Sequence, residues 1–112
     1  MDVYQGSFGS WSDVCREFDL VVDLPDEVLL AVYECGSYDG EAVVIYRQAD
    51  RYYFVSGSHC SCYGLEGQWD PEEYSAELLV EALRRGDHFW WAYDDAAALC
   101  DAVIGRVLAR SQ

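Results

Sequence analysis

The residues of this sequence that could do chemistry are concentrated in one short segment. His59-Cys60-Ser61-Cys62 places an imidazole beside two thiols, and zinc prefers such ligands in proteins. Cys35 could join them, with His59 or His88 as the fourth ligand, because the ends of the first and third expected strands lie at the same edge of the sheet. The spacing argues against this site, since structural zinc sites usually separate paired cysteines by about two to four residues. Zinc binding by Cys35, His59, Cys60 and Cys62 is therefore the alternative hypothesis, and no cofactor is expected.

A cysteine nucleophile activated by a histidine base is the enzymatic interpretation of the same segment. His59 and Cys60 are neighbours, so their side chains point to opposite faces of an extended chain. The sequence contains no phosphate-binding glycine loop, nucleophile elbow or metalloprotease helix. Its acids are scattered, and it has no lysine that could hold an anionic substrate. We therefore expect a protein that binds a partner and is not an enzyme.

The charge balance indicates what kind of partner this is. The chain has 21 Asp and Glu residues against seven arginines, for a formal net charge of −14. So negative a chain repels phosphate backbones and anionic membranes, which argues against direct binding to nucleic acid or membranes. A basic protein would be attracted instead. Acidity can also serve solubility alone, and that alternative stays open.

Cellular location and redox state are predicted from the apolar pattern and the cysteines. No segment has the long apolar run needed to span a bilayer, and the start Met1-Asp2-Val3-Tyr4 lacks the basic residues of a signal peptide. We expect a cytoplasmic protein. Its five cysteines are then expected to be reduced thiols, and their odd number also argues against a disulfide framework.

Three runs rich in β-branched and aromatic residues predict strands over residues 28–35, 41–47 and 52–56. The first two are separated by a turn with an Asp39-Gly40 pair, and the last two by Ala49-Asp50. Connections this short predict an antiparallel meander.

Helices are expected before and after these strands. Ser10 is a candidate N-cap for a helix over 11–18, and Asp70-Pro71 has the residue types that begin a second helix, which Arg84-Arg85-Gly86 would close. Asp94 or Asp95 would cap a third.

The predicted element order is α-β-β-β-α-α. It predicts an α+β fold in which about three helices pack on one face of a three-stranded antiparallel meander. A chain of 112 residues has room for one hydrophobic core, so we expect a single domain over residues 1–112. Residues 1–9, with Gly6 and Gly9, are expected to form a loose N-terminal arm.

The segment from Ser58 to Trp69, SHCSCYGLEGQW, is the most specific motif. With the strands before it, it resembles a family of short proteins from bacteriophages and bacteria that share a three-stranded meander, a near-identical segment and an acidic, proline-started helix. The resemblance covers roughly residues 28–86. It implies this fold and a phage or prophage setting, hence the cytoplasm of a host cell, and it leaves the activity open.

Packing is the leading account of this motif. We expect the apolar and cysteine side chains of the segment to fold back and cover the edge of the sheet, with glycines permitting the tight path. The side chains concerned are Cys60, Cys62, Tyr63, Leu65 and Trp69.

The function that combines these observations is that of a phage-type acidic inhibitor. It would bind a nucleic-acid-binding bacterial defence complex and block its basic DNA or RNA groove, as anti-CRISPR and other DNA-mimic proteins do. Three acids spaced four residues apart would form one line along the second helix, and a tryptophan pair could anchor the partner or a homodimer. The predicted partner-binding residues are Asp13, Glu17, Asp19, Asp23, Asp26, Glu27, Asp39, Glu73, Glu77, Glu81, Trp90 and Trp91.

Overall fold

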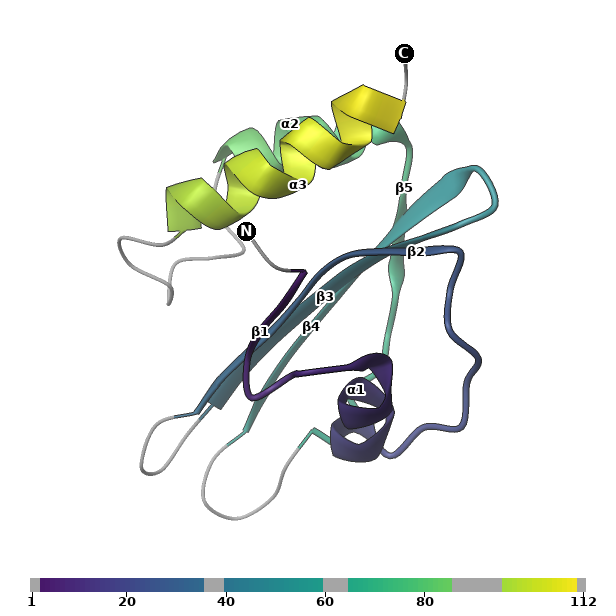
Figure 1. Cartoon of the computed structure of the whole chain (residues 1–112), viewed down its shortest axis with the longest axis vertical. Helices are drawn as coiled ribbons and strands as arrows, with labels where there is room; N and C mark the ends of the chain where they lie inside the picture. Colours follow the sequence, from purple (N-terminus) through teal and green to yellow (C-terminus); the bar gives the residue numbers. More distant parts are fainter. Residues whose placement is uncertain (1–2, 36–39, 60–64, 86–95, 111–112) are drawn as a thin grey trace.

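The computed structural model describes residues 3–35, 40–59, 65–85 and 96–110, and its centre is a five-stranded sheet (Figure 1). The strands follow each other in space in chain order, from β1 to β5. β1 runs parallel to β2, and the remaining neighbours are antiparallel. The strand bounds are Tyr4–Gly6 for β1, Glu27–Cys35 for β2, Gly40–Gln48 for β3, Arg51–His59 for β4 and Glu72–Tyr74 for β5.

The predicted α+β class is confirmed, and β2, β3 and β4 form the predicted antiparallel meander. The prediction of only three strands is wrong, because a three-residue strand is added at each edge. β1 lies within residues 1–9, where a loose arm was expected. Tyr4 pairs with Ala31 of β2, and Phe8 just beyond the strand is buried.

Helices cover both faces of the sheet, which corrects the prediction that all helices lie on one face. β3 is the reason, because its residues 42–45 are all buried and alternate between the two faces. Figure 1 shows α2 and α3 on one side of the sheet and α1 on the other. The helix bounds are Trp11–Phe18 for α1, Ala76–Arg85 for α2 and Ala96–Arg110 for α3. None of the helices in the described ranges is long and apolar enough to cross a membrane.

The helix predicted over 11–18 is confirmed as α1, with the predicted N-cap. The Ser10 side chain accepts a hydrogen bond from the amide of Asp13, which satisfies one of the free amides of the first turn. Asp19 ends the helix in the left-handed conformation, with φ of 57°. Val14 and Phe18 are the buried side chains of α1, so these two residues attach the helix to the sheet.

The second helix begins later than Asp70-Pro71 predicts. Residues 72–74 form β5, which pairs with residues 52–54 of β4. Ser75 then caps α2, because its hydroxyl and its carbonyl accept hydrogen bonds from the first amides of the helix. Pro71 is compatible with this arrangement, since proline is tolerated where an edge strand begins. The predicted caps Asp94 and Asp95 of α3 lie outside the described residues.

A β-bulge in β2 connects the sheet to α3. The register of β2 against β3 shifts between Val28 and Leu30, which leaves Leu29 as the extra residue. The Leu29 carbonyl accepts a hydrogen bond of 2.8 Å from Nη1 of Arg106 on α3. Leu29 and Leu30 are both completely buried on the side of α2 and α3. The bulge therefore supplies both apolar surface and a polar contact to the helix layer.

We predict that alanine substitutions at two glycines change the free energy of unfolding in opposite directions. Gly6 has φ of +64°, and a Cβ there would overlap the backbone oxygen of Tyr33 in β2. Gly6→Ala should therefore lower the free energy of unfolding by at least ~2 kcal/mol. Gly105 lies in α3, and apart from the adjacent helix backbone no atom of the described residues lies within 4 Å of an added Cβ. Gly105→Ala should therefore raise the free energy of unfolding by about 0.5–1 kcal/mol.

Urea denaturation of both variants measures this difference. Equal stability of Gly6→Ala and the unchanged protein would contradict the pairing of β1 with β2.

Candidate functional site

A cluster of half-buried aromatic rings lies on the side of the sheet that α1 covers. It consists of Trp11, Tyr46, Tyr53 and Trp69, and we call it the aromatic surface. Tyr46 stacks on Tyr53 and on Trp69, with centroid distances of 5.2 and 5.9 Å. Trp11 meets Tyr46 and Trp69 edge-on at 6.1 and 6.0 Å. These are the stacked and T-shaped arrangements that aromatic pairs prefer, so the rings support each other in fixed positions.

Four separate parts of the chain contribute to the aromatic surface. Trp11 is the first residue of α1, Tyr46 and Tyr53 face each other across β3 and β4, and Trp69 precedes β5. Trp69 also packs edge-on against the buried Phe18 of α1, at a centroid distance of 5.1 Å. The sequence patterns did not indicate this cluster. The predicted turn at 49–50 was the available signal, because it fixes Tyr46 opposite Tyr53.

Residues 65–69, the C-terminal part of the SHCSCYGLEGQW motif, are attached to the sheet through Leu65 and Gln68, and this positions Trp69. Leu65 is completely buried and lies close to Gly57 of β4 and to the α1 layer. The predicted packing of the motif is therefore confirmed for Leu65 and Trp69, but these side chains lie on the α1 face of the sheet and not at its edge, where they were expected. Cys60, Cys62 and Tyr63 lie outside the described residues.

Gln68 of the motif extends the sheet with its side chain. Its Oε1 accepts a hydrogen bond of 2.9 Å from the Ser58 amide, and its Nε2 donates one of 2.6 Å to the Ser58 carbonyl. The register of β4 and β5 would place a backbone partner for Ser58 at this position. The Gln68 amide therefore replaces a strand residue where β5 has not yet begun. This contact limits the exposed edge of β4 and fixes the position of the neighbouring Trp69.

An exposed apolar loop borders the aromatic surface. It covers residues 19–24, between α1 and β2, and includes the exposed side chains of Val21, Val22 and Leu24. The Trp11 indole N–H donates a hydrogen bond of 3.3 Å to the Val22 carbonyl, which attaches the loop to the aromatic surface. Asp23 is an exposed acid of this loop. Rings, aliphatic side chains and carboxylates therefore occur together on this side.

The predicted acid Glu73 also belongs to this side and not to a helix. It lies in β5 opposite Tyr53, whose hydroxyl donates a hydrogen bond of 3.3 Å to Glu73 Oε1. Glu77 and Glu81 are exposed in α2. The predicted acidic line through Glu73, Glu77 and Glu81 is therefore wrong, because the helix begins after Glu73.

Two other predicted acids have structural partners. Asp26 Oδ2 accepts a hydrogen bond of 2.8 Å from the amide of Ala49, which has φ of 55° in the β3–β4 turn. Arg47 is almost buried, and its Nε lies 3.4 Å from Glu27 Oε1 while Nη1 lies 3.7 Å from Asp26 Oδ2. Asp26 and Glu27 therefore attach the start of β2 to the β3–β4 turn. Their carboxylates have this structural role, because each is paired with Arg47.

The remaining predicted acids of α1 lie beside Arg16. Asp13 forms an ion pair of 2.8 Å with Arg16 and also accepts a hydrogen bond from the amide of Gly9. Glu17 lies 3.8 Å from Arg16 Nε. Arg16 is 67% exposed, so these pairs contribute little to stability, and the partly buried Asp13 already has a partner for each of its two oxygens. Asp39, Trp90 and Trp91 lie outside the described residues.

The register gives partial information on the zinc hypothesis. Cys35 and His59 are both backbone partners of Gly40, one on each side of β3. Their backbones are thus two strand spacings apart, about 10 Å. Cys60, Cys62 and His88 lie outside the described residues, and within the described ranges no group of three or more His, Cys, Asp or Glu side chains could hold a metal ion.

Burial raises the pKa of two side chains, Tyr46 and Cys100. Burial, followed by the proximity of Tyr53, raises the pKa of Tyr46 above its ordinary value. The Tyr46 hydroxyl therefore carries no charge at neutral pH, and nearby carboxylates such as Glu73 supply the negative charge on this side. Burial and the nearby Asp101 raise the pKa of the Cys100 thiol, which makes this thiol a weaker nucleophile than a free cysteine.

We predict that Gln68→Glu destabilises the protein. A carboxylate keeps the acceptor for the Ser58 amide but cannot donate to the Ser58 carbonyl, so the free energy of unfolding should fall by roughly 1 kcal/mol. Gln48→Glu is the matched control, because Gln48 Oε1 accepts a hydrogen bond from the Asp26 amide and glutamate retains an acceptor. Urea denaturation followed by tryptophan fluorescence measures both variants. Equal losses would show that added charge, and not the lost donor, causes the effect.

Comparison of the chain with protein-family models, with curated proteins and with solved structures found no match. The phage and bacterial family that the motif resembles therefore stays a prediction. The candidate site rests on the geometry described above.

Proposed function

We propose that this protein binds the basic surface of a nucleic-acid-binding protein and thereby acts as a phage-type acidic inhibitor. One observation carries the proposal: half-buried, mutually stacked rings are joined to an exposed apolar loop, with carboxylates on both sides. Asp23 lies on the loop side and Glu73 on the β5 side. Such a surface combines large contact area with negative potential.

Aromatic and carboxylate groups have complementary roles in such binding. Tryptophan and tyrosine supply most of the energy of many interfaces, because they bury large area with few rotatable bonds. A guanidinium or ammonium group placed over a ring gains further attraction, and arginine does so best. Carboxylates speed the encounter with a basic partner and favour it over acidic ones.

The overall charge selects the class of partner. Grooves that bind DNA or RNA are lined by arginine and lysine, which also pair well with carboxylates. A chain with a net charge of −14 is attracted to such a groove and competes with the phosphate backbone for it. Occupying the groove would be enough to block nucleic-acid binding, and no catalytic step is needed. A bacterial defence complex of the CRISPR type is a target that fits the phage setting implied by the motif resemblance.

We predict that removal of charges weakens binding to the partner protein only when the charges lie next to the aromatic surface. The partner is first recovered from a bacterial lysate with tagged protein, eluted with salt and identified. Asp23→Asn with Glu73→Gln should then weaken its affinity about tenfold at low salt, since two charges that border the contact are lost. Glu81→Gln with Asp101→Asn is the matched control, because these exposed acids lie on α2 and α3. The control should change affinity by less than about twofold.

Equal losses for the two pairs would assign the effect to total charge and would count against this surface. An affinity that does not change between low and high salt would contradict charge-driven binding altogether.

A zinc-binding accessory domain is the second candidate, supported by the shared pairing of Cys35 and His59 with Gly40. Cys60 and Cys62 would supply the other ligands. Protein purified without chelator should then contain about one zinc per chain, because a closed site of this type retains its metal. Elemental analysis measures the ratio. A metal-free sample with a cooperative unfolding transition would exclude the zinc hypothesis.

A further inference from the structure

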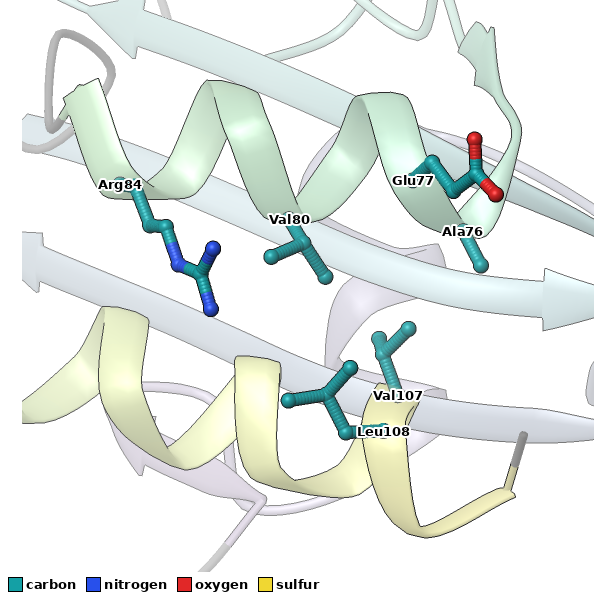
Figure 2. A pocket seen from close by; sticks show the side chains of 6 residues that line it. All are labelled: Ala76, Glu77, Val80, Arg84, Val107 and Leu108. Carbon is teal, nitrogen blue, oxygen red and sulfur yellow. The ribbon is translucent and has the colours of Figure 1, made fainter. Parts of the chain in front are cut away.

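The outer side of the α2–α3 layer contains an apolar groove with charged residues at its ends (Figure 2). It encloses about 450 Å³ and lies between the two helices, on the side away from the sheet. The helices run antiparallel, since Ala76 at the start of α2 lies across from Val107 near the end of α3 (Figure 2). Val80 and Leu108 point into the groove from opposite helices. Leu108 is 44% exposed, so part of its apolar surface is open to solvent at the groove.

The charges at the groove are opposite in sign and two helical turns apart. Glu77 lies in the first turn of α2 and Arg84 in the last. Seven residues separate them, so they lie on one face of the helix, about 10 Å apart along its axis. In Figure 2, Arg84 reaches towards α3 at one end of the groove, and Glu77 lies at the other end, with its carboxylate beside α2 and turned away from α3.

We infer that a second copy of this chain occupies the groove in a two-fold dimer. A two-fold axis that lies between the α2 helices of the two copies, level with Val80, brings these helices together antiparallel. Glu77 of each copy then faces Arg84 of the other, which forms two equivalent ion pairs. Leu108 of each copy contacts the apolar side chains that line the groove, between the two ion pairs. The groove is thus complementary to itself in both charge and hydrophobicity, and neither an all-acidic nor an all-basic ligand matches its two ends.

The net charge sets the conditions under which the dimer forms. Two chains of −14 repel each other at low salt, and the repulsion is screened at physiological ionic strength. The dimer fraction should therefore rise when salt is increased from about 0.01 M to 0.15 M. Sedimentation velocity of the full chain over a range of concentrations measures this fraction. A protein that stays monomeric up to about 1 mM at 0.15 M salt would overturn the inference.

A matched pair of leucine substitutions locates the contact. Leu108→Glu places a carboxylate in the apolar groove and should abolish the dimer. Leu78→Glu makes the same change at an exposed leucine of α2 that does not line the groove, and should leave the dimer in place. Both side chains are on the surface, and circular dichroism checks that both variants are folded. A dimer that persists in Leu108→Glu would place the contact elsewhere and would overturn the inference.

Charge exchange gives the most specific test. Glu77→Arg leaves arginine at both ends of the groove, and Arg84→Glu leaves glutamate at both, so each variant alone should be monomeric. A mixture of the two should form a heterodimer, because every arginine then faces a glutamate across the two-fold axis. Failure of the mixture to associate, while the unchanged protein dimerises, would overturn the proposed pairing. The test needs no other partner, so it is independent of the proposed inhibitor function.

Discussion

The two apolar faces of the central strand β3 are the constraint on which the rest of the structure depends. Residues 42–45 alternate between the faces and are all buried, so both sides of the sheet must be covered. α2 and α3 cover one side with two helices. α1 has only eight residues, and Phe8, Leu65 and Trp69 complete the cover on the other side. The aromatic surface is the border of this smaller cover, which explains why its rings are only half buried.

Secondary structure was predictable from the sequence wherever the local signal was long. β2, β3 and β4 have nine residues each, and their β-branched and aromatic residues indicated strands independently of the rest of the fold. β1 and β5 have three residues each, too few for a periodic pattern, and they exist because a neighbouring strand offers free backbone groups. Asp70-Pro71 and Ser75 both have cap-like residue types. α2 begins after Ser75 because residues 72–74 pair with β4, and a pairing with a distant strand cannot be predicted from the local sequence.

The candidate site was only partly predictable, for a related reason. Residue type alone correctly indicated the packing of Leu65 and Trp69, because large apolar side chains beside a sheet edge are usually buried. The acids were predicted to bind a partner together because of their shared charge. In the structure they have different neighbours and therefore different roles. Asp26 and Glu27 pair with Arg47, whereas Glu73 borders the aromatic rings through Tyr53. Charge can be counted from a sequence, but the partner of each charge depends on the fold.

The two proposed surfaces lie on opposite sides of one sheet, and this separation has a consequence for binding. A dimer formed through the α2–α3 groove would leave both aromatic surfaces facing outwards, since α1 lies across the sheet from α2 and α3 (Figure 1). Such a dimer would present two acidic, aromatic contacts at a fixed separation. Once one contact binds a target with repeated basic sites, the second binds at a high effective concentration. Moderate affinity at each half-buried surface would then be sufficient for tight binding overall, which suits a domain too small to bury a large interface on its own.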